Sequence, residues 1–456
     1  MTILNDLKQK INQRKAKLAV IGLGYVGLPV AAMLADAGFD VIGVEIKTDR
    51  VEKINASILP MEGHEPGMQE LLSKVISGGK LSATPRYDDL ADRDVILIDV
   101  ETPVNRLNIP QYEALRSSLE SLGPVLKPGA LVIVESTTAP GTMEKLARPL
   151  LEEGTGRKIN EGFFLGNCPE RVMPGKLLAN LKNLSRVVGG GTLETAETMV
   201  QLYKFIVTAD LDPVNWITAE LVKTTENAYR DTQIAFANEV ALICEAVGGD
   251  VWKVRELVNK SPYRQMHLPG AGVGGHCIPK DPWLLAYSVS DLDVPLKIIP
   301  SSREVNNSMP LHIADLLRQG LAEHHQGLSG SQVIVMGYAY LEDSDDARNS
   351  PSETLVRRLK ELGAHVVVHD PFIAEYQGNL SQFAENCDAA IVMVKHSEYS
   401  ALDMAAFKDL LGQPVLVDGR GIYDKEQMER HGYTYRCVGI GQNTSKYEGL
   451  WRASYV

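Results

Sequence analysis

Short apolar runs alternate with helical patterns in the first third of the chain. Four runs are too apolar to be half exposed and are expected to be strands: residues 18–24, 41–45, 94–101 and 130–137. The segments between them carry apolar side chains at helical spacing, as in residues 26–37 and 112–122. Strands buried on both faces and separated by helices are typical of a parallel α/β sheet.

The pattern changes near residue 215. Residues 215–247 contain neither glycine nor proline and predict one unusually long helix, which Gly248 ends. Such a helix needs support from both neighbouring domains or from a second subunit. A further helical pattern covers residues 305–321.

The α/β alternation returns in the last third, after a linker at residues 326–332. The fold class predicted is therefore α/β, with an N-terminal Rossmann-like NAD domain, a central all-helical domain with one long helix, and a C-terminal Rossmann-like α/β domain. The expected bounds are 1–212, 213–325 and 326–456. The strands expected in the last domain are residues 333–340, 365–371, 389–395 and 415–420.

Composition narrows the function classes. The net charge of −12 argues against a nucleic-acid partner. The five cysteines are odd in number and scattered, so neither a disulfide framework nor a zinc site is expected, no metal is predicted, and a reducing, cytoplasmic setting fits. The uncharged residues 18–35 are interrupted by three glycines and Pro29, so no membrane segment is expected.

A glycine motif follows the first strand. Gly22-Leu23-Gly24-Tyr25-Val26-Gly27 is a GxGxxG that opens a helix, where a tight turn, close approach of a pyrophosphate and close helix–strand packing each require a glycine. Glu45 ends the second strand and is expected to bind the cofactor ribose. Its charge favours NAD over NADP, although Lys47 and Arg50 follow closely. The alternative is a glycine-rich turn in a plain α/β protein.

Two later strand ends, Thr102 and Thr137, are expected at the carboxyl edge of the sheet, where the cofactor binds.

The most informative stretch is AGVGGHCIPKDP, residues 271–282. Its glycines let a ligand or a second backbone approach Cys277. If a helix starts near Cys277, its dipole favours the thiolate, and Asp281 shares a helical face with that thiol. Lys223 and Asn227 likewise lie four apart on the long helix. The alternatives are a buried structural cysteine and a solvated polar stripe.

These residues resemble the nucleotide-sugar 6-dehydrogenases, which include UDP-glucose and UDP-N-acetylmannosamine dehydrogenases. The matches extend over nearly the whole chain: VIGLGYVGLPVA (20–31), HEPGM (64–68), ESTTAPGT (135–142), NCPERVMPGK (167–176), AELVKTTENAYRDTQIAFANE (219–239), GVGGHCIPKDP (272–282), SDDARNSP (344–351), HDP (369–371) and VDGRGI (417–422). The resemblance implies an N-terminal NAD domain, a long helix that forms a homodimer, a UDP-sugar substrate bound by the C-terminal domain, and no metal.

The resemblance also implies a mechanism. The C6 alcohol is oxidised to an aldehyde, Cys277 attacks it to form a thiohemiacetal, a second oxidation gives a thioester, and water releases the uronate. Lys223 and Asn227 match the residues that stabilise the oxyanion, and Asp281 matches the acid–base residue. Further matches are Thr137 as a water-holding residue, Glu170, Arg171, Gly274 and His276 around the substrate, Arg264 toward a neighbouring subunit, and Arg420 at the nucleotide.

Departures from the UDP-glucose pattern indicate the substrate. GGHCIPKD and PERVMP, with Pro174 in place of a second glutamate, are similar to the N-acetylhexosamine branch, so UDP-N-acetylmannosamine is favoured. UDP-N-acetylglucosamine, UDP-N-acetylgalactosamine and UDP-glucose stay open. Leu341 replaces the family lysine, so one nucleotide contact is expected to be absent or supplied elsewhere.

Two other functions compete with this one. A two-electron 3-hydroxyacid-type dehydrogenase also uses a lysine and an asparagine on a long helix, but it needs neither Cys277 nor a third domain. A non-catalytic nucleotide-sugar sensor would keep the fold, but the intact set of Cys277, Lys223, Asn227 and Asp281 argues against lost catalysis.

Overall fold

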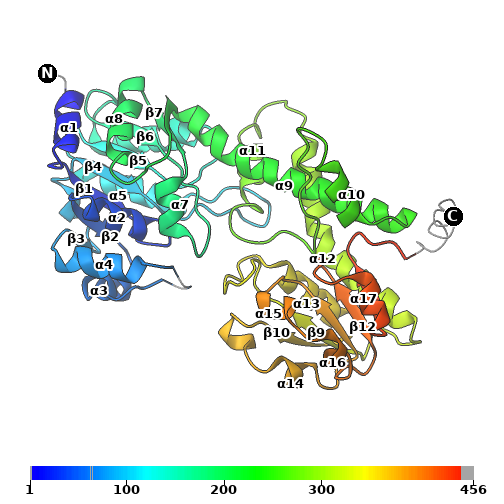
Figure 1. The fold of residues 1–456 in the computed structure, drawn as a ribbon. Helices are drawn as coiled ribbons and strands as arrows, with labels where there is room; N and C mark the ends of the chain where they lie inside the picture. Colours follow the sequence, from blue (N-terminus) through cyan, green and yellow to red (C-terminus); the bar gives the residue numbers. More distant parts are fainter. Residues whose placement is uncertain (1–2, 62, 64, 443–456) are drawn as a thin grey trace. The chain divides into compact units, whose positions relative to one another are not determined.

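The computed structural model describes residues 3–61, 63 and 65–442. The chain divides into two compact units. The N-terminal unit comprises Met1–Glu226 and Trp283–Val294, and the C-terminal unit comprises Asn227–Pro282 and Pro295–Val456. Each unit is built around its own β-sheet (Figure 1).

The N-terminal sheet has eight strands in the order β3-β2-β1-β4-β5-β6-β7-β8. They are β1 (Lys17–Ile21), β2 (Asp40–Val44), β3 (Leu81–Thr84), β4 (Val95–Ile98), β5 (Leu131–Val134), β6 (Phe164–Asn167), β7 (Arg186–Gly190) and β8 (Leu211–Asn215). All neighbouring pairs are parallel except β6 and β7. The order reverses direction between β1 and β4, which is where dinucleotides bind in such sheets.

Alternating side chains bury both faces of this sheet. Leu18 and Val20 of β1 enter one hydrophobic core, whereas Ala19 and Ile21 enter another. The first core is covered by α1 (Ile3–Asn12), α2 (Gly27–Asp36), α3 (Thr48–Asn55), α4 (Met68–Ser77), α7 (Leu177–Asn183) and α8 (Leu193–Tyr203), and the second by α5 (Glu113–Leu122) and α6 (Arg148–Thr155). This two-sided burial explains why the strands are apolar throughout instead of alternating with polar residues.

The long helix is confirmed. α9 (Trp216–Val247) has 32 residues, and its residues from Asn227 onward belong to the C-terminal unit. Gly248 follows with a positive φ of 82°, and Asp250 then caps α10 (Val251–Val258) by accepting two amide hydrogen bonds. The middle segment continues with α11 (Asp281–Tyr287) and α12 (Ile298–Ala322), the second of which is longer than the 305–321 predicted.

The C-terminal sheet has five parallel strands in the order β10-β9-β11-β12-β13. They are β9 (Gln332–Met336), β10 (His365–His369), β11 (Ala389–Val392), β12 (Val415–Asp418) and β13 (Thr434–Cys437). The helices of this domain are α13 (Pro351–Glu361), α14 (Leu380–Ala384), α15 (Ser397–Ser400), α16 (Met404–Lys408) and α17 (Lys425–Arg430). The order reverses between β9 and β11, so the loops after these strands border the expected ligand crevice.

The predicted fold class is confirmed, whereas several predicted elements were too long. The strand expected at residues 94–101 ends at Ile98, because the following residues leave the sheet as a loop at its carboxyl edge. Strands β3, β6, β7, β8 and β13 were not predicted. The domain bounds at 212 and 325 stay a prediction, and residues 443–456 of the third domain lie outside the described residues, as does His64 of the HEPGM motif.

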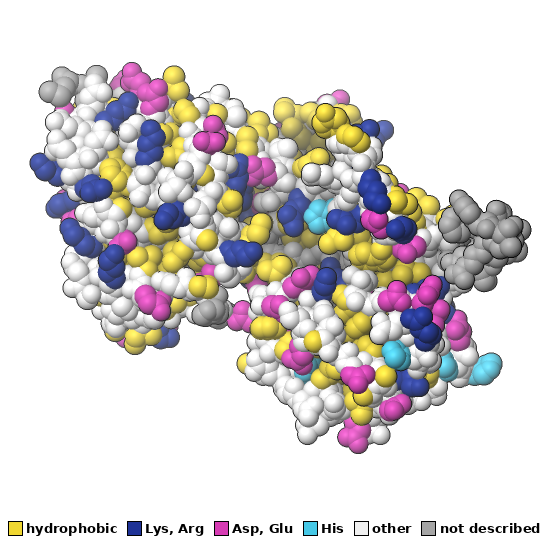
Figure 2. All heavy atoms as spheres, viewed as in Figure 1, with side chains coloured by type: hydrophobic (Ala, Val, Ile, Leu, Met, Phe, Trp, Pro, Cys, Tyr) yellow, Lys and Arg dark blue, Asp and Glu magenta, His cyan; other side chains and the backbone are white. Residues whose placement is uncertain are grey.

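No helix within the described ranges is long and apolar enough to span a membrane. On the face drawn in Figure 2, lysine and arginine side chains of the N-terminal unit are scattered among acidic and neutral ones.

Candidate active site

The three motif glycines meet three different needs. A Cβ on Gly22, which has a φ of 90°, would lie 2.3 Å from the carbonyl oxygen of Asp99. A Cβ on Gly27 would lie 2.0 Å from the carbonyl oxygen of Gly22. A Cβ on Gly24, by contrast, would meet nothing within 4 Å. Gly22 and Gly27 therefore serve the packing of the protein, and Gly24 leaves space for a ligand.

Glu45 stands directly after β2 and is joined to this loop. Its carboxylate accepts the amide hydrogen bond of Lys47 at 3.0 Å, and the Arg50 Nε lies 3.5 Å from its other oxygen. Arg50 also donates to the carbonyl oxygen of Leu23 at 2.8 Å. Because α2 starts at Gly27, just after Val26, the loop presents a helix N-terminus with an acid on its flank, which fits the pyrophosphate and ribose of NAD.

Tyr25 of the loop reaches a second motif. Its hydroxyl donates to Glu65, whose carboxylate also accepts the amides of Gly175 at 2.7 Å and Leu177 at 3.1 Å. Glu65 thus ties the cofactor loop to the segment that leads from β6 into α7. The sequence placed Glu65 in a family motif but assigned it no role.

The ends of β4 and β5 are also connected. The Thr102 hydroxyl donates to the carbonyl oxygen of Thr137 at 2.6 Å, so these two predicted residues lie together. The chain after Thr137 is held by Glu220 of α9, which accepts hydrogen bonds from the Gly141 amide at 2.8 Å and the Met143 amide at 2.9 Å. Burial raises the pKa of Glu220 to about 7 despite these hydrogen bonds.

A buried charged cluster forms around Glu135, which follows β5. Arg186 donates to Glu135 at 3.1 Å, and the Tyr203 hydroxyl donates to the same carboxylate at 2.6 Å. Burial, together with the neighbouring Glu135, raises the pKa of Asp99 well above its ordinary value. The raised pKa reflects the cost of placing a second buried anion next to Glu135.

Lys223 of α9 contacts the loop after β6, which carries the predicted substrate residues Glu170 and Arg171. The Lys223 ammonium donates to the carbonyl oxygen of Glu170 at 2.6 Å. Arg171 forms an ion pair with Glu226 and donates to Ser185. One carboxylate oxygen of Glu170 is buried and has no hydrogen-bond partner among the described residues, as expected of a group that faces water or a substrate.

The helix expected near Cys277 begins later than predicted. Residues 278–280 form a turn, α11 starts at Asp281, and the Cys277 carbonyl accepts the amides of Lys280 at 3.1 Å and Asp281 at 2.9 Å. Cys277 therefore precedes α11, and its carbonyl oxygen accepts the amide four residues later, at the first residue of that helix. Pro282 is the second residue of α11, a position where a missing N–H leaves no helical hydrogen bond unmade.

Asp281 instead faces α9. The Asn227 amide donates to Asp281 at 2.5 Å, and the Lys280 ammonium lies 3.4 Å from the other carboxylate oxygen. The buried side chains of Lys280 and Asp281 and the partly buried side chain of Asn227 thus form one polar cluster in the C-terminal unit. Lys223 precedes Asn227 by about one turn of α9.

His276 is a neutral neighbour of the thiol. Its Nδ1 lies 4.0 Å from the Cys277 sulfur. Burial lowers the pKa of His276 to about 4, with Lys280 and Arg348 adding to the effect. At neutral pH the imidazole can donate or accept a hydrogen bond, but it supplies no positive charge.

The remaining predicted residues of this unit lie in three places. Arg264 is exposed in the segment after α10. Gly274 packs against Tyr340, whose Cβ would lie 2.6 Å from a Cβ on that glycine. Arg420 follows β12 and donates to the carbonyl oxygen of Met393 at 2.7 Å, at the carboxyl edge of the C-terminal sheet.

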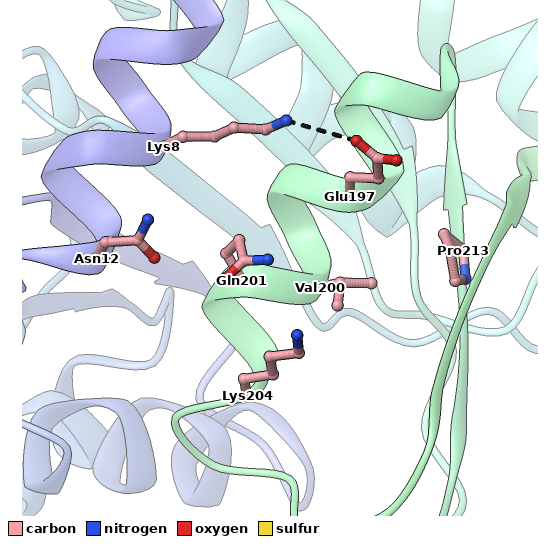
Figure 3. A pocket seen from close by; sticks show the side chains of 7 residues that line it. All are labelled: Lys8, Asn12, Glu197, Val200, Gln201, Lys204 and Pro213. Atoms are coloured by element: carbon pink, nitrogen blue, oxygen red, sulfur yellow. Dashed lines mark ion pairs between the residues drawn. The ribbon is translucent and has the colours of Figure 1, made fainter.

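One surface pocket lies apart from the predicted site residues. The surface pocket in Figure 3 has a volume of about 470 Å³ and lies between α1 and α8, and no predicted site residue lines it. Its lining residues are Lys8, Asn12, Glu197, Val200, Gln201, Lys204 and Pro213. Among the described residues, no three His, Cys, Asp or Glu side chains are grouped as metal ligands.

The fold and these residues define an NAD-dependent oxidoreductase with a second, nucleotide-binding Rossmann-like domain. Three family models match in order. They describe the NAD binding domain (residues 16–207), the central domain (217–308) and the UDP binding domain (334–425) of the UDP-glucose/GDP-mannose dehydrogenase family. The chain belongs to this family and is an NAD-dependent UDP-sugar dehydrogenase.

Relatives of known structure are similar over nearly their whole length. The UDP-N-acetyl-D-mannosamine dehydrogenase of Pyrococcus horikoshii is 36% identical over 93% of this chain and 99% of that protein, and its solved structure has a TM-score of 0.88. The NDP-N-acetyl-D-galactosaminuronic acid dehydrogenase of Methanosarcina mazei Go1 is 35% identical, covers 98% of this chain and 99% of that one, and has a TM-score of 0.87.

Proposed function

We propose that the protein oxidises the C6 hydroxyl of a UDP-N-acetylhexosamine to the carboxylate, with UDP-N-acetyl-D-mannosamine as the favoured substrate and Cys277 as the covalent nucleophile. The observation that carries this proposal is the cluster of Cys277, Asp281 and Asn227, in which a thiol precedes a helix whose first residue is held by the asparagine. A two-electron dehydrogenase has no use for this thiol.

The protein residues divide the work. The Cys277 sulfur adds to the aldehyde carbon and forms the thiohemiacetal, and it is the leaving group when water cleaves the later thioester. Asp281 accepts a proton from the C6 hydroxyl or from that water, and Asn227 holds its carboxylate in place. Lys223 and Asn227 stabilise the oxyanion.

Two further residues complete the set. Thr137 holds a water near the reacting carbon, and Glu170 contacts the substrate from its loop after β6. The buried, unpartnered oxygen of Glu170 supports this role. Gly274, His276, Arg171 and Arg420 contribute to substrate binding, and Arg264 contributes from a second subunit.

The cofactor site fits NAD. Gly24 leaves space for the pyrophosphate, and the loop around it consists of Gly22, Tyr25, Val26 and Gly27. Glu45, with Arg50 beside it, binds the ribose. Thr102 and Thr137 contact the cofactor at the ends of β4 and β5. NAD supplies the two-electron acceptor for each oxidation, so one alcohol and one water yield one carboxylate, two NADH and three protons.

The choice of an N-acetylated sugar rests on sequence and chemistry. Both relatives described above are named for N-acetylated sugars, and His276 belongs to the GGHCIPKD stretch that resembles the N-acetylhexosamine branch. A neutral imidazole can donate to an amide carbonyl oxygen, as an acetamido group requires. The mannosamine and galactosamine relatives are similarly close at 36% and 35% identity, so the epimer is decided by experiment.

We also propose a cytoplasmic homodimer. α9 exposes large apolar side chains at intervals of seven residues, with Tyr229 63%, Phe236 60% and Ile243 56% exposed. That spacing places them along one side of the helix, which suits a second copy of the same helix. None of the five cysteines, which all lie within the described residues, forms a disulfide, and this fits a reducing compartment.

The decisive experiment follows NADH with UDP-N-acetylmannosamine, UDP-N-acetylglucosamine, UDP-N-acetylgalactosamine and UDP-glucose, and counts NADH per sugar consumed. We expect two NADH per sugar with an N-acetylated substrate, and we expect Cys277→Ala to form no uronate. One NADH per sugar, or full turnover by C277A, would show a two-electron enzyme. NAD binding without NADH formation from any nucleotide sugar would indicate a sensor.

A further inference from the structure

A turn in the C-terminal domain, residues 346–349, forms hydrogen bonds with the loop that carries Cys277. The Gly275 amide donates to the carbonyl oxygen of Arg348 at 2.9 Å, and the Asn349 side-chain amide donates to the carbonyl oxygen of Gly275 at 3.1 Å. Both backbone polar groups of Gly275, two residues before Cys277, are therefore held by adjacent residues. We name residues 346–349 the clamp turn.

The glycines of the loop that carries Cys277 allow residues of the C-terminal domain to approach it closely. A Cβ on Gly274 would lie 2.9 Å from the carbonyl oxygen of Asn349. Gly275 has a φ of 87°, and a Cβ there would lie 2.8 Å from the Tyr340 ring. The sequence left open whether these glycines admit a ligand or a second backbone, and for Gly274 the structure shows a second backbone.

The clamp turn is held by hydrogen bonds of its own. Arg348 donates to both carboxylate oxygens of Asp346, at 2.9 and 3.1 Å from its Nε, and its amide donates to the same carboxylate at 3.1 Å. The Asp346 carbonyl oxygen accepts the amide of Tyr340 at 2.9 Å. Asn349 has a positive φ of 50°, a conformation that asparagine adopts more readily than most residues, and α13 starts two residues later at Pro351.

From this geometry we infer that Asn349 is a positioning residue for Cys277, acting through Gly275. The inference rests on the proposed function, because it assumes that the Cys277 sulfur must meet a reacting carbon. A displacement of about 1 Å at a reacting atom can slow a reaction about 100-fold. Residues 346–349 lie within the match to the UDP binding domain. The domain that binds the nucleotide therefore also positions the Cys277 sulfur.

The clamp turn also brings a positive charge to this loop. The pKa of Arg348 is raised, chiefly by its hydrogen bond to Asp346, and Tyr340 and Cys277 contribute to the rise. The guanidinium therefore stays charged and keeps its hydrogen bonds to Asp346, which hold in place the residue whose carbonyl oxygen accepts the Gly275 amide.

Two variants separate the clamp from general stability. Asn349→Gly keeps the left-handed backbone and loses the donor, and Asn349→Asp keeps the shape but has no N–H for the Gly275 carbonyl. Asn386→Gly is the matched control, because Asn386 is an exposed asparagine of the same unit with a φ of 67°. Each variant is compared by hydrogen exchange of the peptide around Gly275 and by steady-state turnover with released aldehyde trapped and counted.

We expect faster exchange of the Gly275 peptide in N349G and N349D, with exchange elsewhere unchanged. We also expect kcat for uronate to fall about 10-fold or more, KM for the UDP-sugar to stay within about twofold, and more aldehyde to escape. N386G should match the wild type in every measurement.

Three outcomes would overturn the inference. The first is that hydrogen exchange and turnover of N349G match those of N386G. The second is that hydrogen exchange of the Gly275 peptide rises without any change in kcat. The third is that both kcat and substrate binding are lost because the variant no longer folds. Failure of the proposed function looks different, since the wild type itself would then give one NADH per sugar and no uronate.

Discussion

At the scale of single residues, the cofactor loop shows that three glycines of one motif serve different purposes. Gly22 and Gly27 are required by the protein itself, because a side chain at either would collide with backbone or side-chain atoms of Asp99 or Gly22. Gly24 meets nothing, so its lack of a side chain matters only when a ligand is present. The sequence motif alone treats all three alike.

This contrast gives a matched pair of variants. Gly24→Ala should leave the melting temperature within about 2 °C of the wild type and weaken NAD binding about 10-fold or more, because the new methyl group occupies ligand space. Gly27→Ala should lower the melting temperature and weaken NAD binding together, because its Cβ would lie 2.0 Å from a carbonyl oxygen. Calorimetry and NAD titration test both, and equal melting temperatures for the two variants would contradict the assignment.

At the scale of elements, helix α9 does more than span the middle of the chain. Its residue Glu220 accepts amide hydrogen bonds at the start of the helical segment after Thr142, where a carboxylate suits the exposed N–H groups of a helix beginning. A remote side chain thus takes the place of a local cap. Because Glu220 lies about one turn before Lys223, the segment after Thr137 and the part of α9 that carries Lys223 are held together.

Glu220 should make stability depend on pH. Its pKa is raised from 4.5 to about 7 by burial, so between these values the folded protein holds a proton that the unfolded chain has released. Stability from this group is therefore greatest below pH 4.5 and is lost as the pH rises toward 7, by about 3 kcal/mol at most.

The test compares Glu220→Gln with the wild type at pH 5.5 and 7.5. The variant cannot titrate but loses one acceptor, which costs about 1 kcal/mol. We expect the wild type to have the higher melting temperature at pH 5.5 and to lose that advantage at pH 7.5. A difference between the two proteins that does not change with pH would show that Glu220 titrates normally.

At the scale of the whole molecule, the exposed apolar residues of α9 bear on how many copies of the chain assemble. The exposed row of Tyr229, Phe236 and Ile243 on α9 is unusual for a surface helix, since each side chain is more than half exposed. The proposed dimer buries this row against its copy.

Phe236→Glu should convert a dimer into monomers, because the isologous contact would bring two carboxylates together in an apolar interface. Leu193→Glu is the control, since Leu193 is 62% exposed at the first turn of α8. Sedimentation velocity over a range of concentrations should show a monomer only for F236E. A wild type that sediments as a monomer, or a dimer that survives F236E, would remove α9 from the interface.

The fold and the cofactor were accessible from the sequence because both depend on local patterns. Buried parallel strands read as continuous apolar runs, and the glycines of residues 22–27 stand at fixed offsets from a strand and a helix. The long helix could be located because residues 216–247 lack any residue that breaks a helix. The five missed strands read LSAT, FLGN, RVVGG, LDPVN and TYRC. Polar residues or glycines interrupt each of them, so no continuous apolar run marks them.

The site was predictable only in its residue types. Cys277, Lys223, Asn227 and Asp281 stand in recognisable motifs, and these motifs alone indicated a sugar-nucleotide oxidation. The structure decided which side chains meet: Asn227 with Asp281, Lys223 with Glu170, and Asn349 with Gly275. These pairs are separated by 54, 53 and 74 positions, so their contacts depend on packing between elements, which no local spacing can encode.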